Sequence, residues 1–225
     1  PKVELGSGRV VGAEALLRWT HPSDGPIPPS QFVPIAEETG LIVPLGYWVI
    51  EEACRRFVEW CAAGVALGHV AVNVSLRQLG DANFVDELAR ILVATGVPRG
   101  ALELEVTESM IAERPGELPA MLQRIRELGV RIAIDDFGTG YSSLAYLKHL
   151  PIDELKIDRS FISKMASSKD NHEIVKAIVA LAQSLKLDVI AEGVELDHQL
   201  ATIRGLDCNF GQGFIFSKPL PADAI

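Results

Sequence analysis

The chain has few cysteines, and they show no spacing typical of a metal site or a disulfide framework. Only three of its 225 residues are cysteines, Cys54, Cys61 and Cys208. The number is odd and no CxxC pair occurs. Cys54 and Cys61 lie seven residues apart in a stretch with helical periodicity, so we expect both to face the core as reduced thiols. The alternative, a disulfide or a cysteine metal site, is disfavoured.

Long apolar runs and an excess of basic residues are also absent. No stretch approaches the roughly 20 apolar residues that span a bilayer. The first residues, PKVELGSGRVVG, lack the basic flank and apolar block of a signal peptide. Lys and Arg number 21 against 30 Asp and Glu, a net charge of −9 that argues against binding polymeric nucleic acid. We therefore expect a soluble domain without membrane contact of its own, which can still bind a small anion.

Two common signatures of cofactor and metal sites are missing as well. No GxGxxG follows the first expected strand, which disfavours a dinucleotide-binding domain. The histidines form no HxH, HExxH or adjacent His-Asp arrangement, and we assign them no chemistry: they are His21, His69, His149, His172 and His198. The composition, 48% hydrophobic and 23% charged, is that of a globular protein with a sizeable core.

Short strand-like runs alternate along the whole chain with helix-like stretches. We expect strands at Arg9–Arg18, His69–Val74, Ala101–Val106, Arg131–Asp135, Glu154–Ile157, Asp188–Ala191 and Leu206–Phe210. We expect helices at Leu45–Ala63, Phe84–Ala94, Glu117–Leu128, Glu173–Leu185 and Asp197–Ile203, and a further short helix capped by Ser30. Repeated β-then-α order predicts a parallel sheet closed into a (β/α)-barrel, with an open doubly wound sheet as the alternative.

Polar residues recur in these strands or close to their C-terminal ends, although buried parallel strands are usually apolar. They are Glu14, Asn73, Glu105, Glu108, Asp135, Asp136, Lys156, Glu192 and Gln212. In a barrel these ends converge on one mouth. So many carboxylates need more compensation than one lysine provides, and an all-oxygen set favours Mg²⁺ or Mn²⁺ over zinc.

Asp135 and Asp136 are adjacent where a strand ends, so both can reach one cavity if the backbone turns there. Asp135 would then bridge two cations and Asp136 would hold the second, the arrangement used for in-line phosphoryl displacement. Lys156 is placed to orient or deprotonate an attacking water. A single acid such as Glu105 can instead be a salt-bridged barrel residue, which is the role we expect for Glu103. As an alternative to a metal site, the salt-bridge explanation would have to account separately for every acid at this end of the barrel.

The sequence resembles the EAL-domain family of bacterial cyclic di-GMP phosphodiesterases. The matching motifs are EALLRW, FVPIAEETGLI, NVS, LELEVTES, IDDFGTGYSSL, LKIDRSFI, VIAEGVE and GQGFIFSKPL, in order along essentially the entire chain. The resemblance implies an α/β fold, a modified TIM-type (β/α)₈ barrel whose first strand is antiparallel to the others. It also implies hydrolysis of cyclic di-GMP to linear pGpG by in-line attack of a metal-activated water.

The resemblance assigns roles position by position. The implied metal ligands are Glu14, Asn73, Glu105, Asp135, Asp136 and Glu192. Lys156 matches the lysine that contacts the catalytic water, and Glu192 is either a second-metal ligand or a general base. Arg18, Leu17 and Gln212 match substrate-binding positions. Two Mg²⁺ or Mn²⁺ ions per site are implied, and we expect the larger Ca²⁺ to bind but to support hydrolysis poorly, so that it inhibits.

The segment from Phe137 to Ser143 matches a loop that links metal binding to dimerisation, so a homodimer is implied. Glu108, grouped here with the catalytic residues, matches the glutamate that steadies this loop. We expect residues 1–225 to be a single EAL domain, slightly trimmed at both ends, of a larger multidomain regulator in the bacterial cytoplasm. Any tether to the inner membrane would lie in segments outside this chain.

Two other functions remain open on the sequence alone. A catalytically inactive receptor could bind cyclic di-GMP and signal through dimer contacts, but the acids whose loss would indicate this are all present. An unrelated barrel enzyme acting on phosphorylated sugars would share only the fold.

Overall fold

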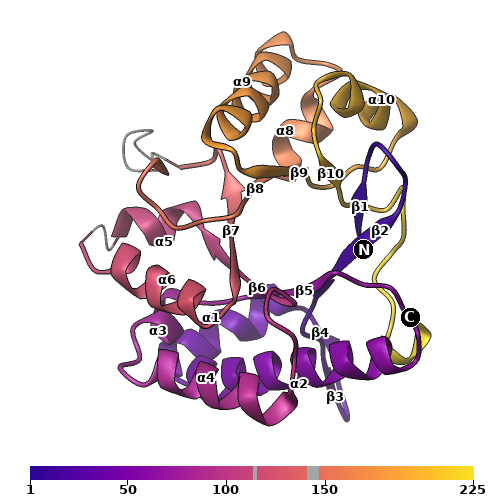
Figure 1. The fold of residues 1–225 in the computed structure, drawn as a ribbon. Helices are drawn as coiled ribbons and strands as arrows, with labels where there is room; N and C mark the ends of the chain where they lie inside the picture. Colours follow the sequence, from indigo (N-terminus) through magenta and orange to yellow (C-terminus); the bar gives the residue numbers. More distant parts are fainter. Residues whose placement is uncertain (114–115, 141–146) are drawn as a thin grey trace.

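The fold is known from a computed structural model, which describes residues 1–113, 116–140 and 147–225. Within these residues, eight strands close into a barrel in the order β1-β10-β9-β8-β7-β6-β5-β2, and Figure 1 looks along the barrel with its helices outside the strands. The strands are β1 (Lys2–Glu4), β2 (Val10–Ala15), β5 (His69–Asn73), β6 (Leu102–Thr107), β7 (Arg131–Phe137), β8 (Glu154–Ile157), β9 (Asp188–Ala191) and β10 (Phe210–Gly211). The expected (β/α)-barrel is therefore confirmed.

Except for α1, which lies on the arm described below, the helices of the described residues cover the outside of the strands. They are α1 (Pro29–Thr39), α2 (Ile42–Ala62), α3 (Leu76–Leu79), α4 (Phe84–Thr95), α5 (Glu108–Glu113), α6 (Leu118–Glu127), α8 (Arg159–Lys164), α9 (Lys169–Leu185) and α10 (Asp197–Gly205), with a final 3₁₀ turn at Ala222–Ala224. Among the described residues, no helix combines the length and apolar character needed to cross a membrane.

β1 makes the barrel unlike an all-parallel one. It pairs antiparallel with both neighbours, β10 and β2, whereas every other pair in the closed barrel is parallel. The expected antiparallel first strand is thus confirmed. The periodicity analysis, however, did not find β1, because a three-residue strand is too short to show a period of two. It also placed the last strand four residues early, at Leu206–Phe210.

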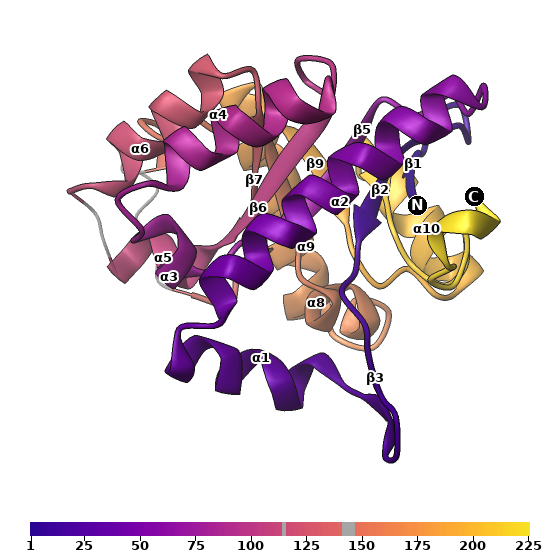
Figure 2. The ribbon, with the colours of Figure 1, turned by 90° about the horizontal axis from the view of Figure 1, so that it is seen from below.

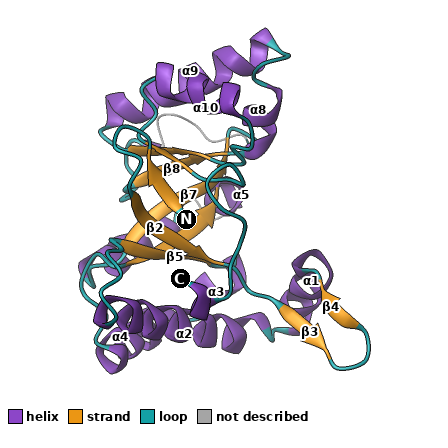
Figure 3. Ribbon diagram, turned by 90° about the vertical axis from the view of Figure 1, so that its right-hand side faces the viewer, coloured by secondary structure: helices purple, strands orange, loops and turns teal. Residues whose placement is uncertain are grey.

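An arm projects from the barrel after β2. It consists of the antiparallel hairpin of β3 (Trp19–His21) and β4 (Gly25–Ile27), followed by α1. Figures 2 and 3 show the hairpin and α1 standing apart from the strands. The expectation that Ser30 caps α1 is wrong: Pro28 is the N-cap and Pro29 the first helical residue, a position where proline loses no helical hydrogen bond.

The strands place apolar side chains toward the helices and charged ones inside the barrel. In β6, Leu102 and Leu104 alternate with Glu103 and Glu105, and all four are at most 1% exposed. Because successive strand side chains point to opposite faces, the two glutamates share the inner face. The barrel interior is therefore ionic, while the apolar core lies between strands and helices.

Two expectations about cysteines and helix ends need correction. Cys54 is buried, but Cys61 is exposed, since it lies in the last turn of α2 beyond the part that packs on the strands. α9 begins at Lys169 rather than Glu173, because the Ser168 side chain accepts a hydrogen bond from the backbone N–H of Asn171 and caps the helix earlier.

Candidate metal centre

Strand register gathers the polar residues at one end of the barrel. Asn73 at the end of β5 is directly opposite Glu105 in β6. Asp135 in β7 is opposite Thr107, two residues beyond Glu105. Lys156 lies within β8, and Glu192 follows the last residue of β9. The C-terminal ends of parallel strands thus bring together residues that are far apart in the sequence.

Lys156 lies at the centre of three carboxylates. Its Nζ atom is 2.7 Å from Glu192 Oε1, 2.9 Å from Glu105 Oε2 and 3.1 Å from Asp135 Oδ1. The lysine is 1% exposed. Burial by itself lowers its pKa, but Glu105 and Glu192 outweigh that effect and raise the pKa well above the ordinary value. Lys156 is therefore an ammonium group here.

Glu14 joins this group through two amide side chains. Asn73 Nδ2 donates to Glu14 Oε1 at 2.8 Å, and Gln212 Nε2 donates to Glu14 Oε2. Burial raises the pKa of Glu14, but Lys156 and these hydrogen bonds bring it below the ordinary value. These contacts keep Glu14 ionised. Because Asn73 and Gln212 contact Glu14 through their amide nitrogens, their amide oxygens do not face it.

Asp135 and Asp136 come close to each other because β7 is irregular near its end. The register with β8 shifts between Ile134 and Phe137, and Asp136 adopts a left-handed backbone with φ of 53°. Aspartate tolerates this conformation better than most residues. Single oxygens of Asp135, Asp136 and Glu192 consequently lie within 4.8 Å of one another. The sequence analysis expected the strand to end at Asp135, whereas β7 continues to Phe137, and the left-handed backbone of Asp136 within the strand is what brings the two aspartates together.

Asp158 is a neighbour that the sequence analysis missed. Its side chain accepts a hydrogen bond from the Ser160 backbone N–H at 3.0 Å and is also hydrogen-bonded to Asp136. Burial and the charges of Asp135 and Asp158 raise the pKa of Asp136 to about 6. The signal was present, since Asp158 is the acid two residues after Lys156 in LKIDRSF.

The cluster carries more negative charge than Lys156 can neutralise. Burial raises the pKa of Glu105 to about 8 and that of Glu192 to about 7, despite the nearby ammonium. The contacts of the buried Glu105 carboxylate are ionic: Oε2 faces Lys156 at 2.9 Å and Oε1 faces Lys2 at 3.3 Å. More carboxylates than ammonium groups, with oxygens of Asp135, Asp136 and Glu192 converging and no His or Cys joining them among the described residues, fit a hard divalent cation.

A second charged cluster fills the barrel interior behind Glu105. Lys2 of β1 pairs with Glu103, with Glu154 at 2.9 Å and with Glu105 at 3.3 Å. Arg131 also pairs with Glu103, at 3.1 Å, so the expected salt-bridge role of Glu103 agrees with its contacts. Oxygens of Glu103 and Glu154 converge with His69 in a way that resembles a metal site, but the Lys2 ammonium already occupies this position.

Glu108 is attached to the loop after β7 rather than to the carboxylate cluster. Its Oε2 atom accepts the backbone N–H of Gly138 at 2.9 Å and of Gly140 at 3.1 Å. A Cβ atom at Gly140 would lie 3.0 Å from the Glu108 carboxyl carbon, so glycine allows this approach. Tyr141 to Ser143, the rest of the expected dimerisation loop, lie outside the described residues.

A cavity of about 930 Å³ opens above the carboxylates, and we call it the mouth cavity. Its floor includes Glu14, Asp135, Lys156, Glu192 and Gln212. Its walls add Arg18 and Phe214, and the Phe214 side chain is 57% exposed. The sequence analysis predicted Arg18 and Gln212 here but not Phe214.

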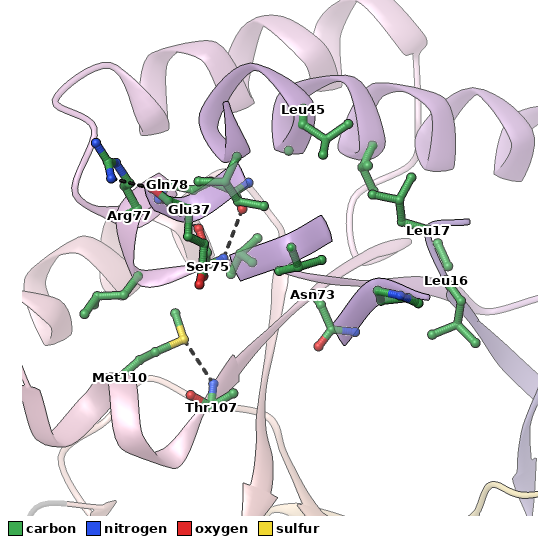
Figure 4. Close-up of a pocket in the computed structure, with 18 of the residues that line it drawn as sticks. Leu16, Leu17, Glu37, Leu45, Asn73, Ser75, Arg77, Gln78, Thr107 and Met110 are labelled. Carbon is green, nitrogen blue, oxygen red and sulfur yellow. Dashed lines mark hydrogen bonds between the residues drawn. The ribbon is translucent and has the colours of Figure 1, made fainter. Parts of the chain in front are cut away.

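A second cavity of about 930 Å³, the arm cavity, lies between the arm, α2, α3 and the ends of β5 and β6. It shares Leu16 and Arg18 with the mouth cavity, so the two adjoin at the end of β2. Figure 4 shows Leu16, Leu17 and Asn73 along one part of it and Met110 in another. Leu17 lines this cavity and not the mouth cavity.

The chain belongs to the EAL domain family, whose sequence profile matches residues 1–219. It is 47% identical over 225 residues to the Pseudomonas aeruginosa "Bifunctional diguanylate cyclase/cyclic di-GMP phosphodiesterase MucR" and to "Cyclic di-GMP phosphodiesterase NbdA" of the same organism. All of the chain is covered in both alignments, but only 33% and 29% of those relatives. The chain thus spans about a third of their length.

Solved structures agree with this assignment. The structure described as "PaMucR Phosphodiesterase, c-di-GMP complex" superposes with a TM-score of 0.96 at 47% identity, covering 100% of this chain and 91% of that one. "Structure of EAL Enzyme Bd1971 - cAMP and cyclic-di-GMP bound form" gives a TM-score of 0.92 at 34% identity, covering 100% and 61%. The family and the fold inferred from the sequence are confirmed.

Proposed function

We propose that this chain is the phosphodiesterase domain of a larger bacterial regulator and hydrolyses cyclic di-GMP to linear pGpG with two Mg²⁺ or Mn²⁺ ions. The observation that supports this most directly is the set of convergent carboxylates at the mouth, all retained, around an ammonium that cannot neutralise them. Relatives that cover the chain in full are named as phosphodiesterases of this nucleotide.

Each residue of the cluster has a role in the proposal. Glu14, Asn73, Glu105, Asp135, Asp136 and Glu192 supply oxygen ligands. Such ions, when bound, act as Lewis acids toward a phosphate and its attacking water. Lys156, fixed by three carboxylates and charged, donates hydrogen bonds to that water. Gln212 keeps Glu14 oriented, and Glu108 supports the reaction only by fixing the loop that continues from Asp136 and Phe137.

The two cavities suit the two halves of a cyclic dinucleotide. They meet at Leu16 and Arg18, beside Glu14. We place one guanine in each, with the exposed Phe214 ring stacking on the base in the mouth cavity and Leu17 contacting the base in the arm cavity. Arg18, at the junction, contacts the phosphate between them.

We also propose a homodimer formed through the loop from Phe137 to Ser143. Asp136 directly precedes this loop and its backbone oxygen accepts the Thr139 hydroxyl, while Glu108 accepts the N–H groups of Gly138 and Gly140. A metal ion that moves Asp136 would therefore also move the loop. Sedimentation with and without Mn²⁺ tests this, and an unchanged monomer in both conditions contradicts it.

The decisive experiment is turnover of cyclic di-GMP by the purified chain with Mg²⁺ or Mn²⁺, with products resolved by chromatography. We expect pGpG, and we expect it to vanish in Glu14→Gln, which keeps the side-chain shape, but to persist in Lys176→Ala, an exposed residue of α9. Tight binding without product under either metal would instead identify the inactive receptor.

A further inference from the structure

Two cations on the wall of the mouth cavity have no carboxylate partner. Arg159, the first residue of α8, and Lys218, in the segment after β10, both line the cavity and are exposed. In the part of the chain that the structure describes, no Asp or Glu oxygen lies within 4 Å of either charged group. Many basic residues elsewhere, such as Arg126 and Arg131, are paired with acids.

Arg159 is held against the loop that carries Glu192. Gly193, the next residue, has φ of +65°, and a Cβ atom there would lie 2.5 Å from the Arg159 Cβ. Glycine at 193 therefore permits the arginine stem to pack on this loop. The Asp158 side chain also accepts the Arg159 backbone N–H. The guanidinium thus extends from a fixed position beside the metal centre.

The segment that leads to Lys218 is attached to the same loop from another direction. The Val194 backbone N–H donates to Gln212 at 3.0 Å, and the Ile215 N–H donates to Val194 at 3.1 Å. The chain then turns, with the Phe216 N–H donating to Gly213 at 3.1 Å. Two elements distant in sequence therefore present a cation each around the loop that carries Glu192 to Val194.

We infer that Arg159 and Lys218 together bind the phosphate of the cyclic dinucleotide that is not cleaved. The inference rests on the proposed function and deepens it. A cyclic dinucleotide carries two phosphates, and the acidic floor repels whichever one is not neutralised by bound ions. Arg159 and Lys218 are charged, unpaired and anchored beside the floor, so they offset that repulsion without competing for the carboxylates. They act in substrate affinity and not in bond cleavage.

The test is steady-state kinetics of Arg159→Ala, Lys218→Ala and the double variant on cyclic di-GMP. Loss of one partly exposed ion pair predicts about a fivefold rise in KM for each single variant, with kcat within twofold of wild type. Arg159→Lys and Lys218→Arg should recover most of the affinity, and Lys176→Ala should behave as wild type. Because exposed ion pairs are screened, the KM of wild type should rise with NaCl more steeply than that of the double variant.

Equal KM values for wild type and the double variant overturn the inference. A fall in kcat in Arg159→Ala that also occurs in Arg159→Lys overturns it as well, because that result would indicate a distorted metal centre. If the wild-type chain does not hydrolyse cyclic di-GMP, the proposed function fails separately. The same variants then decide the inference by calorimetric Kd for cyclic di-GMP, where a weaker Kd supports it and an unchanged Kd contradicts it.

Discussion

Lys156 is the residue through which the charges of the metal centre are connected. It contacts acids contributed by β6, β7 and the end of β9, all within 3.1 Å. Divalent ions would take over part of its neutralising role, leaving its N–H groups free for the attacking water. Its position explains how one buried lysine can belong both to the interior of the barrel and to the proposed reaction.

Replacing Lys156 with methionine should lower kcat by about 10²- to 10³-fold, the usual cost of removing a preorganised hydrogen-bond donor from the reacting groups. The variant should still gain thermal stability when Mn²⁺ is added, since the oxygen ligands remain. Turnover assays and melting curves measure the two effects. Lys156→Arg is the matched control for charge, and a Lys156→Met variant with wild-type kcat would refute the role.

The position of a residue on a strand made most of the site predictable. Glu14, Asn73, Glu105 and Asp135 could be predicted because polar residues at strand ends are conspicuous among apolar neighbours. Lys2 and Asp158 could not be predicted in this way. Lys2 belongs to a strand too short to recognise, and Asp158 looks like an ordinary helix cap until its contact with Asp136 is known.

Among the elements, the described part of the loop after β7 has two backbone N–H groups bound to one carboxylate. Glu108 accepts the backbone N–H groups of Gly138 and Gly140 and is 3% exposed. Since removing it would leave these two part-buried donors without their acceptor, the loop should then open locally. The element that continues from the metal centre thus depends on a residue outside that centre.

In Glu108→Ala we expect amide hydrogen exchange at Gly138 and Gly140 to accelerate by about 10-fold or more, and kcat to fall by about 10-fold. Glu108→Gln keeps an acceptor oxygen and should lie between this variant and wild type. Exchange is measured by NMR or mass spectrometry. Unchanged protection at both glycines in Glu108→Ala would show that something else holds the loop.

β1 contributes more to stability through the ion pairs of Lys2 than through the backbone pairing of its three residues. Lys2→Met should reduce the free energy of unfolding by about 3–5 kcal/mol, since it leaves Glu103 and Glu154 buried without their ammonium. Urea denaturation measures this. Adding Glu154→Gln to Lys2→Met should restore part of the loss, and a Lys2→Met variant as stable as wild type would contradict the pairing.

The elements were predictable in proportion to their length and regularity. β8 and β9 were expected at their observed bounds, because β8 alternates polar and apolar residues with a period of two and β9 is a short apolar run between two expected helices. The β3–β4 hairpin was not expected, since its sequence, WTHPSDGPI, is rich in Gly and Pro and has little alternation. Closure of the barrel by an antiparallel strand came only from the family resemblance.

For the whole molecule, metal binding and pH should act together on stability. The pKa values of Glu105, Glu192 and Asp136 are raised to about 8, 7 and 6, above their ordinary values of 4.5, 4.5 and 3.8. The metal-free folded state therefore binds more protons than the unfolded chain. The stability that these three groups contribute to the folded state is present at low pH and is lost as the pH rises from about 4 to 8.

Metal ions bind the deprotonated carboxylates, so the gain in Tm on adding Mn²⁺ should grow between pH 6 and pH 8. Differential scanning calorimetry at fixed Mn²⁺ concentration measures it. In Glu105→Gln the gain should be smaller and should depend less on pH. A gain that shrinks with rising pH would contradict the assigned ligands.

The ionic interior of this barrel has a consequence for how the sequence can change over time. Where other barrels stack Val, Ile and Leu, this one keeps glutamates whose mutual repulsion opposes folding. Replacing Glu105, whose burial raises its pKa, with a neutral residue of similar shape is therefore favoured by thermostability and opposed by selection for turnover. A lineage released from that selection would retain its shape, tolerate heat better and lose its chemistry first.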